Sequence, residues 1–87
     1  MNDIANYCKV HGIYLGTYLR FEDEHDGYKT HYAKVHRITK QDCICGDVSY
    51  RSCYIFNVNR LYDYIFNRKL TVVDKNEVIR YKNEVQK

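Results

Sequence analysis

The sequence contains no proline and no tryptophan, and it has only three phenylalanines and one methionine among its 87 residues. Tyrosine, with ten copies, is therefore the main large side chain available to the fold. A tyrosine combines an apolar ring with a hydroxyl that needs a hydrogen-bond partner, so it suits half-buried positions and ligand-binding surfaces better than a dry core. Ten tyrosines in a small basic chain indicate a binding surface made of rings and cations.

Long apolar runs, internal repeats and linkers rich in proline, glycine or serine are missing as well. A membrane-spanning helix needs about 20 apolar residues, so we expect a soluble protein with no membrane partner. We expect one compact domain over residues 1–87. The first residues lack the basic-then-apolar pattern of a secretory signal, which predicts a cytoplasmic protein with four reduced cysteines.

The motifs of common catalytic sites are also missing. There is no phosphate-binding loop, dinucleotide glycine fingerprint, nucleophile elbow or paired-carboxylate motif. His31 and His36 could in principle serve as an acid and a base. Five residues apart on a strand, however, they point to opposite faces. We therefore expect no enzymatic activity.

Charge is distributed unevenly. Residues 1–26 carry two basic and five acidic side chains, which gives −3, whereas residues 27–87 carry twelve basic and six acidic ones, which gives +6. The total of +3 thus combines an acidic segment at 22–26 with a basic remainder. A basic face favours polyanions such as nucleic acid, nucleotides or acidic proteins. A mixed, solvated surface is the alternative.

Alternation of apolar and polar side chains predicts β-strands. Residues 13–21 alternate between aliphatic or Phe side chains and the set Tyr14, Tyr18 and Arg20, as a strand with one buried face does. The Asp26-Gly27 pair is typical of a tight turn and predicts a hairpin. Further strands are predicted at 28–38, at 43–45 and, after a turn at Gly46-Asp47, at 48–58.

Two helices and an ambiguous tail complete the pattern. A short helix ends at Gly12, and an asparagine cap starts a helix over 59–67. The tail fits either a hairpin turning at Asn76 or a C-terminal helix with the capping box Asp74-x-x-Glu77, and its β-branched run favours the hairpin. The sequence thus predicts a β-rich α+β fold: an antiparallel meander of about five strands, or a small SH3- or Sm-like barrel, with one short helix near 59–67.

The tyrosines divide into two groups. Tyr50, Tyr54 and Tyr62 fall in line with aliphatic positions, so we expect them in the core. Others alternate with cations on the two strands of the first hairpin, whose faces adjoin if the hairpin forms. Rings beside cations can stack bases and neutralise phosphates; a second buried layer or a homodimer interface are the alternatives. The predicted ligand-binding residues are Tyr14, Tyr18, Arg20, Tyr28, Tyr32, Lys34 and His36.

The spacing of cysteine and histidine residues is compatible with a zinc site. Cys8-x-x-His11-Gly has the form of a zinc knuckle, and Cys43 and Cys45 would complete a Cys3His set, as in a zinc ribbon. The second pair is one residue shorter than a usual knuckle, and Cys53 could replace either member. The alternative is that the thiols are small buried side chains. We expect no cofactor, with zinc as the exception.

One segment resembles a known family. Phe56-Asn57-Val58-Asn59-Arg60-Leu61 is similar to the F-x-x-x-R-I ending of the WYL domain, a small Sm-like barrel that senses nucleic-acid or nucleotide ligands in bacterial regulators. The similarity covers six residues and does not extend to the Trp-Tyr-Leu signature. It implies a small barrel with an anionic ligand.

The sequence therefore predicts a small non-enzymatic binding protein that holds nucleic acid or a nucleotide by tyrosine stacking and basic side chains. A second hypothesis is an inhibitor of the kind that phages and mobile elements use, which blocks a host defence protein by direct contact. Abundant Asn, Lys, Ile and Tyr, typical of an AT-rich genome, favour it. A small zinc-ribbon-like module is the third.

Overall fold

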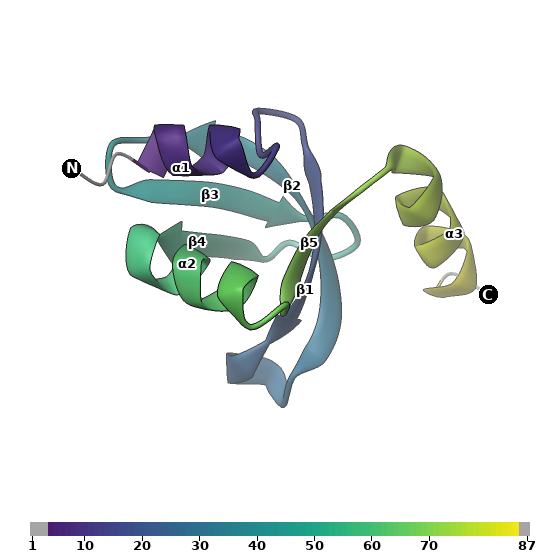
Figure 1. Cartoon of the computed structure of the whole chain (residues 1–87). Coiled ribbons are helices and arrows are strands. Elements are labelled where there is room, and N and C mark those ends of the chain that lie inside the picture. The colour runs from purple at the N-terminus through teal and green to yellow at the C-terminus, as the bar shows by residue number, and fades with distance from the viewer. Residues whose placement is uncertain (1–3, 86–87) are drawn as a thin grey trace.

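A computed structural model describes residues 4–85 of the chain. Five antiparallel strands form one sheet in the order β4-β3-β2-β1-β5, accompanied by three α-helices (Figure 1). This confirms the β-rich α+β class and the five-stranded antiparallel sheet. The elements are α1 (Ile4–Val10), β1 (Tyr18–Asp23), the 3₁₀ turn η1 (Glu24–Asp26), β2 (Lys29–Ile38), β3 (Asp42–Asp47), β4 (Cys53–Asn57), α2 (Val58–Phe66), β5 (Leu70–Val73) and α3 (Lys75–Val85).

The sheet is open. Strands β1 to β4 form a meander, and β5 returns to pair with the free side of β1, with Val73 opposite Tyr18 and Leu70 opposite Phe21. Strands β4 and β5 are the two edges in the described part of the chain. The predicted antiparallel meander is therefore observed in β1 to β4, with β5 added beside β1.

Two strands are shorter than predicted. Strand β1 begins only at Tyr18, because Gly16 has a φ of 86° and the Thr17 hydroxyl accepts a hydrogen bond from the Tyr14 amide at 2.9 Å, so a turn precedes the strand. The predicted turn at Gly46-Asp47 is wrong, because β3 continues through Asp47. The Asp47 carboxylate then accepts hydrogen bonds from the backbone amides of Ser49 and Tyr50. Residues 48–52 therefore form a loop, and β4 begins only at Cys53.

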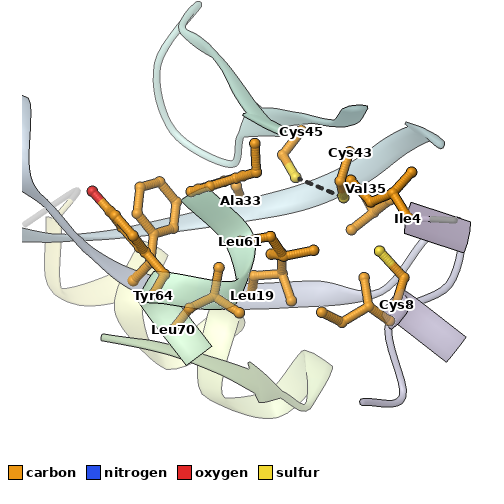
Figure 2. Packing of buried hydrophobic residues seen from close by; sticks show 13 residues of the cluster. Ile4, Cys8, Leu19, Ala33, Val35, Cys43, Cys45, Leu61, Tyr64 and Leu70 are labelled. Carbon is orange, nitrogen blue, oxygen red and sulfur yellow. Dashed lines mark hydrogen bonds between the residues drawn. The ribbon is translucent and has the colours of Figure 1, made fainter. Parts of the chain in front are cut away.

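Alternate residues of the strands bury one face of the sheet. Helices α1 and α2 supply the other half of this core, which Figure 2 shows from close by. Tyr64 is fully buried there, whereas Tyr50 and Tyr62 are 58% and 54% exposed. Their predicted place in the core is wrong, and only Tyr54 of that group packs against it. The largest fully buried residues are Tyr64, Phe21, Phe56, Ile4, Ile13, Leu19, Leu61, Val35, Cys8, Cys43 and Cys45.

The helix predicted near 59–67 is confirmed as α2, which begins one residue earlier. Asn57 caps it, since its side-chain oxygen accepts the Arg60 amide at 2.8 Å. The short helix predicted to end at Gly12 is also confirmed, as α1, whereas α3 is a third helix in the segment for which a hairpin is predicted. No helix within residues 4–85 has the length and apolar character needed to cross a membrane.

The tail is a strand followed by a helix, so the predicted hairpin is wrong. The Asp74 carboxylate accepts the Glu77 amide at 2.8 Å, as an N-terminal cap does, and α3 starts at Lys75. Helix α3 stands apart from α1 and α2 (Figure 1) and contacts Arg20 and Tyr32, whose side chains leave the sheet on the side opposite the core. The second face of the sheet, here called the outer face, is therefore partly covered by α3.

Candidate ligand-binding groove

The predicted pairing of rings and cations across the first hairpin is observed. In the β1–β2 register Tyr18 lies opposite Lys34, and Arg20 lies opposite Tyr32. All four side chains belong to the outer face, because their neighbours Leu19 and Ala33 are fully buried on the core side. The Lys34 ammonium lies 5.8 Å from the centre of the Tyr18 ring.

Helix α3 separates this set into two pairs. Its Glu77 accepts a hydrogen bond from Arg20 Nη1 at 2.6 Å and another from the Tyr32 hydroxyl at 2.8 Å, and the Tyr81 ring lies 4.4 Å from that of Tyr32. Burial raises the pKa of Tyr32, and its hydrogen bond to Glu77 raises the pKa further. The Tyr32 hydroxyl therefore stays protonated as a donor. Arg20 and Tyr32 thus hold α3 in place, whereas Tyr18 and Lys34 remain open to a ligand.

A groove of about 270 Å³ runs beside this contact, between the outer face and α3. Tyr18, Lys34 and His36 form its sheet side, and Val78 and Ile79 form an apolar strip on the helix side. The groove is also lined by Gly46, Asp47, Val48, Lys75 and Lys82.

The groove is cationic. Lys34, Lys75 and Lys82 come from opposite walls, and none has a carboxylate within 4 Å in the part of the chain that the structure describes. Asp47 is the acidic residue of the lining, but its carboxylate accepts the Tyr54 hydroxyl at 2.7 Å and lies 3.6 Å from His31. Its side chain is 1% exposed, so it faces away from the groove and leaves the lysines unneutralised.

Gly46 leaves space for the His36 side chain, which forms part of one wall of the groove. A β-carbon at this position would lie 2.5 Å from Nε2 of His36, so the absent side chain leaves space for the imidazole against the strand. His36 is therefore placed beside Lys34. His31 lies on the core side, with its ring centre 6.0 Å from that of Phe21. The two histidines do not converge, as their spacing predicted.

Two of the predicted ligand-binding residues lie elsewhere. Tyr14 is exposed in the turn before β1, and Tyr28 is exposed at the far end of the hairpin, where the Lys69 ammonium lies 5.0 Å from its ring centre. The structure thus brings together Tyr18, Lys34 and His36 from the predicted set. It adds Lys75 and Lys82, which the sequence reading missed because it favoured a hairpin for this segment. The capping box Asp74-x-x-Glu77 is the sequence feature that could have identified them. A helix that starts there places Lys75 and Lys82, which are seven residues apart, on the same face.

The predicted metal ligands are divided between core and surface. The Cys43 and Cys45 sulfurs are 3.9 Å apart in the core, and Cys8 is fully buried with them (Figure 2). The pKa of Cys43 is raised to about 12, first by its contact with Cys45, so this thiol is protonated near neutral pH. His11 is exposed and packs against Tyr7 instead, with ring centres 4.6 Å apart. No group of three metal-ligating side chains is found in the described residues.

Comparison with family models, with curated proteins and with solved structures finds no match to this chain.

Proposed function

We propose that the chain is a non-enzymatic binding protein whose groove between α3 and the outer face holds a phosphate-bearing ligand, either nucleic acid or a nucleotide. The observation that carries this proposal is the convergence of Lys34, Lys75 and Lys82 around Tyr18 without a carboxylate to neutralise them. Clustered ammonium groups attract phosphate, and a neighbouring ring offers a stacking surface for a base.

The size of the groove limits what it takes. Its 270 Å³ lie just below the range of roughly 300–1,000 Å³ typical of small-molecule sites. One nucleotide unit, free or within a strand, is therefore the expected occupant. The apolar strip of Val78 and Ile79 suits the flat face of a base.

The test is binding of a fluorescently labelled single-stranded oligonucleotide and of a labelled mononucleotide at several salt concentrations. For a single strand, the slope of log K against log salt is about −0.7 for each phosphate neutralised. Replacing Lys34 or Lys82 by Gln should weaken binding by roughly threefold to tenfold and reduce that slope by about 0.7.

Lys40→Gln is the matched control, because Lys40 is an exposed lysine in the turn between β2 and β3 and does not line the groove. It should change affinity by less than about twofold. Equal losses in the groove variants and in Lys40→Gln would contradict the proposal, since they would indicate attraction to net charge alone.

Contact with another protein is the second candidate, and the exposed aromatic side chains of α2, next to the half-buried Tyr7 of α1, favour it. The Tyr62 and Phe66 rings are stacked at 5.9 Å, and Tyr7 lies 6.0 Å from Tyr62. Phe66 is 71% exposed. Aromatic residues of this kind are typical anchors of protein interfaces. Binding that is insensitive to salt, and that Phe66→Ser abolishes while Lys34→Gln does not, would favour this function over the first.

A further inference from the structure

A second, smaller hollow lies on the outer face, beyond Arg20 and away from the α3 groove. Its volume is about 70 Å³. Strands β1, β2 and β5 and the segment between α2 and β5 all contribute to it. The polar side chains that line it are those of Arg20, Glu22, Thr30, Arg68, Lys69 and Thr71.

The hollow has an excess of positive charge. Arg68 and Lys69 have no carboxylate within 4 Å among the residues that the structure describes. Arg20 uses Nη1 for Glu77, and the guanidinium has further N–H donors. Glu22 is the acidic residue of the lining, so three cations face one carboxylate. Thr30 and Thr71 add hydroxyl donors from the neighbouring strands β2 and β5.

The volume matches a single oxyanion group. A water molecule takes about 30 Å³ in the liquid, so 70 Å³ corresponds to roughly two waters. That space accepts a phosphate group and excludes a nucleobase. Arginine, lysine and threonine side chains are the donors that commonly hold phosphate oxygens.

The backbone at Arg68 is in a conformation that favours glycine. The Lys69 amide donates to the Tyr64 carbonyl at 2.8 Å and the Arg68 amide to the Ile65 carbonyl at 3.1 Å, which is the Schellman pattern at the end of α2. Arg68 occupies the left-handed position of this motif, with a φ of 58°. A side chain in this conformation lowers the stability of the fold by roughly 1 kcal/mol relative to glycine. The fold tolerates this strain, and an arginine guanidinium is thereby placed beside the hollow.

We propose that Arg68 and Lys69, with the hydroxyls of Thr30 and Thr71, form a binding site for one phosphate group, separate from the α3 groove. The phosphate is either free or part of a nucleic-acid backbone, since both present the same oxygens. The Lys69 ammonium lies over the Tyr28 ring, 5.0 Å from its centre. The site uses no residue that lines the groove, so it does not depend on the function proposed above.

The test is an NMR titration of the whole chain with inorganic phosphate, exchanged for chloride at constant ionic strength. The amides of residues 68, 69 and 71 should shift and saturate. Arg68→Gly should raise the melting temperature, because glycine relieves the strain, and at the same time weaken phosphate binding at least threefold. A residue with only a structural role could not give both effects. Lys69→Gln should weaken binding without the gain in stability.

Lys40→Gln and Lys34→Gln are the controls and should leave the phosphate affinity at residues 68–71 unchanged. The proposal is overturned if these amides do not saturate, or if Arg68→Gly binds phosphate as tightly as the original chain. A single-stranded oligonucleotide that displaces phosphate from these amides identifies a nucleic-acid backbone as the source. If the oligonucleotide leaves them unchanged while phosphate saturates them, the ligand is free phosphate.

Discussion

At the scale of single residues, neighbouring tyrosines on one helix have different surroundings. Tyr64 is fully buried in the core between the sheet and α2, and its hydroxyl accepts a hydrogen bond from the Glu24 amide at 3.1 Å. Tyr62, two residues earlier, lies on the exposed side of the same helix. The Tyr64 hydroxyl thereby connects α2 to the turn η1, at the far end of the first hairpin.

We expect Tyr64→Phe to lower the free energy of unfolding by about 1–2 kcal/mol, because the Glu24 amide loses its partner while the ring still fills the core. Urea denaturation measures this loss. Tyr62→Phe is the matched control, and it should stay within about 0.5 kcal/mol of the original chain. Equal losses in both variants would contradict a role for the buried hydroxyl.

At the scale of elements, α3 is held to the sheet by few contacts. Val78 is its buried apolar residue, and Glu77 provides the hydrogen bonds to Arg20 and Tyr32. The ion pair with Arg20 is partly exposed, with 42% of the Arg20 side chain open to solvent, so its contribution is modest. The position of the groove lysines on α3 therefore depends on a small set of polar contacts.

Glu77→Ala should loosen α3 without unfolding the sheet. We expect the α3 amides to exchange hydrogen roughly threefold to tenfold faster, while the β2 and β3 amides keep their protection. The groove should also bind its ligand more weakly, although Glu77 does not line it. Glu84→Ala is the control, since Glu84 lies on the same helix and has no ion pair among the described residues. Unchanged exchange in Glu77→Ala would show that the apolar contacts of Val78 and Tyr81 hold the helix without Glu77.

At the scale of the whole molecule, the sequence predicts the sheet better than the site. Alternation along residues 13–21 identifies the face that carries Leu19 and Phe21, and the turn at Asp26-Gly27 identifies the pairing of β1 with β2. Local pattern cannot predict the bulge between Val35 and Arg37, which returns Ile38 to the core side. It also leaves the tail undecided, because residues 71–73 are β-branched while Asp74 caps a helix. The groove depends on that helix, so two of its three lysines could not be assigned from the sequence.

Alkaline pH should destabilise the whole molecule. Four tyrosines have a raised pKa, and burial is the largest cause in each of them: Tyr7, Tyr32, Tyr54 and Tyr81. Contact with Cys45 raises the pKa of Cys43 in the same direction. These groups stay protonated in the native state at a pH where the unfolded chain, with values near 8.5 for Cys and 10 for Tyr, has lost its protons.

The unfolded state therefore binds fewer protons from about pH 8 upward, where Cys43 titrates first and the tyrosines follow, and the free energy of unfolding falls as pH rises from there. Below that pH these groups are protonated in both states and add no pH dependence. Urea denaturation at a series of pH values measures the slope, and tyrosinate absorbance follows the ionisation. Tyr54→Phe should reduce the slope because it removes the hydroxyl that donates to Asp47, whereas Tyr62→Phe, at an exposed position, should retain it. Stability that is constant up to pH 11 would show that these hydroxyls are not buried in solution.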